Sequence, residues 1–163
     1  MAAGSTYTPL ATQTLGSAAA SVTFSSISGA YTDLVVVVVA STSGNLKIEL
    51  NSDTGTNYSN TLVYGTGTSA LSARNTNSTG LLFGTTANTV GNGVNLYHFM
   101  NYSNTTTNKT VLSRGNDIDN GLVRADVGLW RSTSAITSIK FISNLGANLA
   151  TGSTFTLYGI AAA

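Results

Sequence analysis

The sequence has no cysteine, a single proline and very few charged residues. Its 163 residues include 7 lysines and arginines and 6 aspartates and glutamates. Without cysteine, stability cannot depend on an oxidising compartment, so we expect the chain to fold in a reducing cytosol. The charged share of 8% is well below the roughly 25% of an ordinary globular domain. Threonine, serine, asparagine and glycine must therefore supply the polar surface.

Charge is also too weakly biased to draw in a polyanion. The net charge is +1 and the first basic residue is Lys47, so the chain has no basic N-terminal arm. We expect neither nucleic acid nor an anionic membrane as a partner. The N-terminal residues lack the charged and apolar regions of a signal peptide. The most apolar run, residues 34–40, is too short for a membrane helix and reads as a buried strand.

The pattern that is present is that of β-structure. Glycine, asparagine, serine and threonine interrupt every window in which a helical period could develop, whereas threonine, valine, tyrosine and phenylalanine favour strands. Apolar and polar residues alternate in residues 20–25, 46–51 and 153–160. Further strands are expected at residues 9–15, 34–40, 62–64, 80–84, 93–102, 109–114, 122–130 and 136–142.

This spacing of short strands predicts an all-β chain folded as an antiparallel β-sandwich, with the jelly roll as the commonest arrangement of this size. We expect residues 1–9 to form a flexible N-terminal arm and residues 10–163 a single domain. Two segments, residues 34–40 and 96–100, are apolar on both faces. Either a neighbouring subunit covers their second face, giving a homodimer or homotrimer, or the loop of residues 51–73 folds over it.

Groups that could carry catalysis are scarce. The one histidine, His98, alternates with Leu96 and Met100 in an expected strand, and no nucleophile elbow of the type Gly-x-Ser-x-Gly is present. Glu49 lies on the polar face of its strand, where pairing with Lys47 is more natural than service in a glycosidase pair. We therefore expect no enzymatic activity and no cofactor, and we interpret His98 as a packed or interface residue.

Binding candidates are weak as well. Asp117 and Asp119 place oxygen ligands in a turn, as calcium prefers, but without the EF-hand pattern they are more typical of ordinary turn chemistry. Aromatic residues could stack against sugars, although buried core positions are the simpler interpretation. These are Trp130, Tyr58, Tyr64, Tyr97 and Tyr102. Contact with a partner is assigned to the N-terminal arm and to the loop of residues 51–60, specifically to Thr6, Tyr7, Asp53, Asn57 and Tyr58.

Several phrases give the sequence a family resemblance. They are residues 29–36 (GAYTDLVV), 50–59 (LNSDTGTNYS), 101–114 (NYSNTTTNKTVLSR), 130–139 (WRSTSAITSI) and 152–160 (GSTFTLYGI). With these phrases the chain resembles small β-rich virion structural proteins of tailed bacteriophages over most of its length. None of the phrases is a catalytic signature, so the resemblance implies a class of particle protein and brings no active-site residues with it.

Within that class, the resemblance implies a head decoration or cement protein that clamps the major capsid protein of an assembled phage head. Such a protein is made in the host bacterial cytoplasm and ends in the virion. Few charges make its contacts insensitive to salt, which fits this use. One alternative is a tail fibre tip or adaptor that binds a glycan of the host surface. A second is a glycan-processing enzyme that uses Glu49 or Asp119.

Overall fold

The computed structural model describes residues 6–83 and 93–161, and every regular element within these ranges is a β-strand. Accordingly, none of the described segments is a helix that could span a membrane. In chain order the strands are β1 (Tyr7–Thr14), β2 (Ser21–Phe24), β3 (Asp33–Ala40), β4 (Leu46–Leu50), β5 (Tyr58–Gly65), β6 (Ala70–Ser78), β7 (Leu81–Phe83), β8 (Gly93–Met100), β9 (Lys109–Asp117), β10 (Leu122–Trp130), β11 (Ile139–Ser143) and β12 (Thr154–Ile160).

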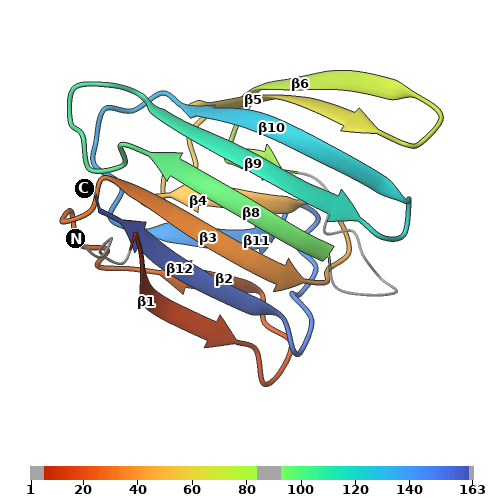
Figure 1. Ribbon diagram of the computed structural model, residues 1–163, viewed down its shortest axis with the longest axis horizontal. Helices are drawn as coiled ribbons and strands as arrows, with labels where there is room; N and C mark the ends of the chain where they lie inside the picture. Colours follow the sequence, from red (N-terminus) through yellow and green to blue (C-terminus); the bar gives the residue numbers. More distant parts are fainter. Residues whose placement is uncertain (1–5, 84–92, 162–163) are drawn as a thin grey trace, which may run out of the picture.

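These strands form two antiparallel sheets (Figure 1). The large sheet has eight strands in the order β1-β12-β3-β8-β9-β10-β5-β6, and the small sheet has four in the order β2-β11-β4-β7. The expected antiparallel β-sandwich is thereby confirmed. Its finer description as a jelly roll stays a prediction.

The core lies between the sheets and is centred on Phe141 of β11. The ring of Phe141 lies 6.4 Å from Phe24 of its own sheet, 5.7 Å from Tyr97 and 5.3 Å from Phe155, both on the large sheet. Phe141 and Phe155 face the core because buried and partly exposed positions alternate strictly along β11 and β12. Burying one such side chain contributes about 1.5–3 kcal/mol, so this cluster fixes how the two sheets stack.

A glycine sets the distance between β10 and β7. A Cβ atom on Gly128 would lie 2.7 Å from Cζ of Phe83 and 2.8 Å from Cδ2 of Leu81. Both distances are shorter than side-chain atoms tolerate. The missing side chain therefore lets the short edge strand β7 pack against the large sheet.

The segment 51–73 does not fold over residues 34–40, so that expectation is wrong. It contains β5 and the start of β6, which lie in the large sheet itself, separated from β3 by β8, β9 and β10. A tight turn joins the two strands, with the Thr66 amide donating to the Ser69 carbonyl at 3.1 Å and Gly67 at a φ of +85°. The many turn-forming residues of this segment suggested a loop. However, Tyr58, Asn60 and Leu62 lie at alternate positions and are buried, as in a strand.

Residues 7–9, which were expected to belong to a flexible N-terminal arm, form the start of a strand instead. Strand β1 begins at Tyr7, which pairs with Ile160, and Thr8 and Pro9 pair with Gly159 and Tyr158. Their polar composition is typical of a flexible arm, but their backbone groups pair with those of β12. Residues 1–5 lie outside the described part of the chain.

Candidate docking surface

The large sheet has an outer face, turned away from the small sheet, on which no other described strand packs. Neighbouring residues line up there in two rows that cross the strands. In the first row Val35 pairs with His98, His98 with Leu112, Leu112 with Val127, and Val127 with Thr61. The second row runs from Leu96 through Arg114 and Ala125 to Val63. These rows bring residues far apart in the sequence onto one surface.

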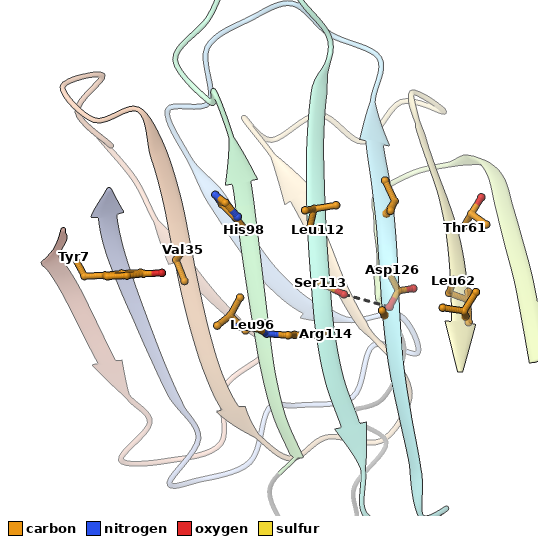
Figure 2. A pocket seen from close by; sticks show the side chains of 13 residues that line it. Tyr7, Val35, Thr61, Leu62, Leu96, His98, Leu112, Ser113, Arg114 and Asp126 are labelled. Atoms are coloured by element: carbon orange, nitrogen blue, oxygen red, sulfur yellow. Dashed lines mark hydrogen bonds between the residues drawn. The ribbon is translucent and has the colours of Figure 1, made fainter. Parts of the chain in front are cut away.

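The two rows form the floor of a groove of about 480 Å³. It crosses five adjacent strands, from β3 to β5, and at a strand spacing of about 4.8 Å it is roughly 19 Å long. Tyr7 closes one end, where its side chain reaches from β1 toward Val35 (Figure 2). Its ring meets that of Tyr158 edge-on. The volume lies within the range of small-molecule sites, about 300–1,000 Å³, but the groove is open along its length.

Aliphatic side chains dominate this face and are unusually exposed. Val127 is 52% exposed, Val63 57% and Val123 65%. The same face also carries Val94, Met100 and Leu112, all of them exposed. An uncovered apolar surface of this kind marks a binding site more often than a free surface. This is the second apolar face that the sequence predicts for residues 34–40 and 96–100, and it extends over β9, β10 and β5.

Charge is placed at two points of the groove. Arg114 lies in the second row and is exposed, and no carboxylate of a described residue forms an ion pair with it. At the other point, His98 Nε2 lies 2.8 Å from Asp33 Oδ2. Within the groove, Arg114 thus offers a guanidinium that has no ion-pair partner among the described residues and lies in aliphatic surroundings, which suits an apolar partner that carries a carboxylate.

His98 therefore lines the groove and contacts an acid. For a hydrolytic triad, the ring would also need a hydroxyl nucleophile in contact with it. The cross-strand neighbours of His98 are Val35 and Leu112, and among the described residues only Asp33 is hydrogen-bonded to its ring. The arrangement can hold a charged or hydrogen-bonding group of a partner, but it does not present the parts of a triad.

Most of the aromatic side chains considered for sugar stacking belong to the core. Tyr58, Tyr97 and Tyr102 are fully buried, Trp130 is 2% exposed, and Tyr58 stacks on Trp130 with the ring centroids 6.1 Å apart. Only Tyr64 is partly exposed. Four of the five are therefore unavailable as stacking platforms.

The expected contact residues of the 51–60 loop form a turn that is tied to Trp130 of β10. The Asp53 carboxylate accepts hydrogen bonds from Trp130 Nε1 at 2.7 Å, the Gly55 amide at 2.8 Å and Asn57 Nδ2 at 3.0 Å. The bond from Trp130 is the main reason that the pKa of Asp53 is lowered. The hydroxyl of Tyr58 donates to the Asp53 carbonyl. Being buried, Tyr58 cannot serve as a surface contact, whereas Asn57 is exposed.

The remaining candidates are distributed over the molecule. Thr6 is exposed beside Tyr7. Asp117, considered for calcium, is buried and accepts hydrogen bonds from the amide and Nδ2 of Asn120, while Asp119 is exposed. No group of three or more histidine, aspartate or glutamate side chains that could hold a metal occurs within residues 6–83 and 93–161.

Glu49 is nearly buried between two lysines of the small sheet. Its carboxylate lies 2.9 Å from Lys47 Nζ and 3.2 Å from Lys140 Nζ. The pairing with Lys47 agrees with the sequence interpretation. Both carboxylate oxygens have a cation, so the residue is held in a surface ion-pair cluster away from the groove.

A buried polar cluster on the inner face was not foreseen. Asp126 accepts from Arg124 Nε at 2.8 Å, from Ser113 Oγ at 3.2 Å and from Asn60 Nδ2 at 3.4 Å. The sequence does contain a pattern that indicates this cluster. Arg124 and Asp126 are two residues apart in a strand, so their side chains lie on the same face. Three side chains already donate to the carboxylate, so the cluster is a structural network beneath the groove floor.

No protein-family model matches this chain, and no curated protein matches it either.

Proposed function

We propose that this protein is a structural binding module that docks, through the groove on the outer face of its large sheet, onto a protein surface of a phage particle. The observation that carries the proposal is the exposed aliphatic face formed around Leu112, Val127 and Val63. Leaving this face in water costs about 25 cal/mol for each Å² of apolar surface, and a partner would remove that cost.

The chemistry of the groove favours a protein partner over a glycan. Glycans need stacking rings and dense hydrogen-bonding groups, whereas the two rows of the floor are aliphatic except for His98, Thr61 and Arg114, and the one aromatic ring of the lining, that of Tyr7, lies at one end. A convex element of a capsid protein with aliphatic side chains and one carboxylate would fill the groove and pair with Arg114. Because only one charge is involved, docking would persist across a wide range of salt concentration.

Head decoration is the use that this surface supports best. A cement protein is soluble before docking and buries neutral surface upon docking. The threonine- and asparagine-rich exterior provides the first property, and the groove provides the second. The resemblance to small virion proteins of tailed phages points in the same direction. We therefore propose that the protein is a component of the virion that binds and stabilises the assembled head.

The test measures copy number and attachment in purified particles of the phage that encodes the chain. Quantitative mass spectrometry should find many copies on the head, and added protein should rebind to stripped heads. A few copies at one vertex would shift the assignment to the tail. Complete absence of the protein from particles would overturn the proposal.

A matched pair of variants ties attachment to the groove. Leu112→Asp places a carboxylate on the groove floor, while Leu145→Asp makes the same change at a side chain that is 72% exposed in a turn of the small sheet. Both positions are exposed, so both variants should fold. We expect Leu112→Asp to abolish rebinding and Leu145→Asp to leave it intact. Equal rebinding of the two would exclude the groove as the docking surface.

A further inference from the structure

One edge of the large sheet is long and open. Strand β6 has nine residues and pairs only with β5, so its other side presents unpaired backbone groups within the described chain. Residues Ala70–Arg74 are exposed on both faces of the sheet. An edge of this kind is a template for another extended strand.

The other three sheet edges are protected. Strand β1, at the opposite edge of the large sheet, contains Pro9 and a break in register between Pro9 and Ala11. The edges of the small sheet are β2 with four residues and β7 with three. Proline, irregularity and shortness are the usual means of blocking edge pairing. Strand β6 has none of them in its exposed part and carries one charge, Arg74.

We infer that β6 pairs with β6 of a second copy of this chain, in antiparallel orientation about a two-fold axis. Backbone amides and carbonyls in a row are matched by another β-strand, which fixes the chemical class of the partner. A second copy is favoured because the strand is compatible with itself. Such an interface is isologous, so each contact is made twice.

The charges of β6 select the register. Hydrogen-bonded and non-hydrogen-bonded pairs alternate along an antiparallel ladder, so a two-fold axis must place one residue opposite its own copy. Centring on Arg74 would bring two guanidinium groups face to face, which is unfavourable. Further along, Asn75 bonds to Asn60 and Asn77 to Arg131. Among the remaining positions of Ala70–Arg74, Ala73 lies nearest the middle of the nine-residue strand and so pairs the greatest length of it. We therefore take Ala73 as the centre, which places Arg74 opposite Ser72 of the other copy.

This pairing would join the two large sheets into one continuous sheet. A two-fold axis between antiparallel strands of one sheet is perpendicular to it, so both outer faces, and with them both grooves, point to the same side. A dimer could then engage two sites on one surface, which raises apparent affinity without new contacts. The pairing itself does not require that the grooves bind anything.

The test uses the absence of native cysteine. A single Cys at position 73 would lie opposite its own copy, at the short cross-strand distance that a disulfide can bridge. Under mild oxidation we expect Ala73→Cys to form a covalent dimer rapidly. The control is Ala11→Cys, an exposed alanine on the protected edge strand β1. It should cross-link at least about tenfold more slowly, at the rate of random collision.

Association without a cross-link is measured by sedimentation equilibrium. One strand pair is a small interface, so we expect the unmodified chain to dimerise in the micromolar range. Ala73→Lys should weaken dimerisation at least about tenfold, because two ammonium groups would meet at the axis, while Ala11→Lys should not. The inference is overturned if the unmodified chain stays monomeric at high micromolar concentration, or if both members of either variant pair behave alike. Neither outcome bears on docking through the groove, which Leu112→Asp tests.

Discussion

Asp33 and His98 join the neighbouring strands β3 and β8 at the groove, with Asp33 Oδ2 2.8 Å from His98 Nε2. The other carboxylate oxygen, Oδ1, accepts a hydrogen bond from the Asn101 amide at 2.7 Å. Asn101 has a φ of +48° and begins the turn that follows β8. The Asp33 carboxylate therefore positions both the His98 side chain in the groove and the backbone of Asn101, where β8 ends.

Replacing Asp33 should destabilise the protein in proportion to the bonds lost. Asp33→Ala removes both interactions and should lower the free energy of unfolding by about 1–3 kcal/mol. Asp33→Asn keeps an oxygen acceptor for the Asn101 amide and should cost less. Urea unfolding of the three proteins measures the order. If Asp33→Asn were as unstable as Asp33→Ala, the bond to His98 would dominate and the turn would not depend on Asp33.

Two buried tyrosines predict opposite effects of the same substitution. The Tyr58 hydroxyl donates to the Asp53 carbonyl at 3.0 Å and accepts from the Leu50 amide at 3.1 Å. The equally buried Tyr97 hydroxyl has no hydrogen-bond partner among the described residues. We expect Tyr58→Phe to lower the free energy of unfolding by about 1–3 kcal/mol, and Tyr97→Phe to leave it unchanged or raise it by up to about 1 kcal/mol. Similar losses in both would mean that the Tyr97 hydroxyl is bonded in solution.

The sequence predicts most of the sandwich because its strands alternate. Residues 46–51 and 153–160 are expected strands, and the structure has β4 at Leu46–Leu50 and β12 at Thr154–Ile160. Strand β6 was missed for a physical reason. It lies at an edge with both faces exposed over Ala70–Arg74, so burial does not impose an apolar face on it. The local alternation of apolar and polar residues therefore gives no signal for this strand.

The docking surface was predicted only in part. The two-faced segments 34–40 and 96–100 indicate that a second apolar surface exists, and they supply Val35, Leu96 and His98. The rest of the groove depends on register, which aligns Leu112, Val127 and Thr61 although they lie far apart in the chain. Contact residues chosen for polarity, such as Asp53 and Asn57, therefore lie elsewhere, and of that set only Tyr7 lines the groove.

Gly128 should not tolerate a methyl group. An alanine Cβ would lie under 3 Å from atoms of both Phe83 and Leu81, so β7 or its side chains would have to shift. Overpacking of this kind typically costs about 1–3 kcal/mol. Gly16→Ala is the control, because nothing lies within 4 Å of its added Cβ, and it should change stability by less than about 0.5 kcal/mol. The unfolding temperatures of the two variants are compared. Equal temperatures would show that Phe83 and Leu81 of β7 do not pack closely against Gly128.

Lys109 is 1% exposed, and its ammonium group donates to the carbonyls of Thr107 at 2.7 Å and Thr133 at 3.1 Å. Burial lowers the pKa of Lys109 from its ordinary value of 10.5. At neutral pH both folded and unfolded states are protonated, so the burial cost is present in full. Between the folded pKa and 10.5 the unfolded state holds a proton that the folded state has released, so this residue's contribution to stability rises with pH.

Comparison with Lys109→Met isolates this effect. Burial raises the pKa of Tyr58, Tyr97 and Tyr102, so near pH 10 and above these residues destabilise the folded state as pH rises, but equally in both proteins. The difference in free energy of unfolding, unmodified protein minus variant, should be flat near neutral pH and should increase as pH approaches 10.5. Denaturant titrations across this range measure it. A difference that stays constant with pH would mean that Lys109 keeps its ordinary pKa, and that its two carbonyl partners fully compensate for burial.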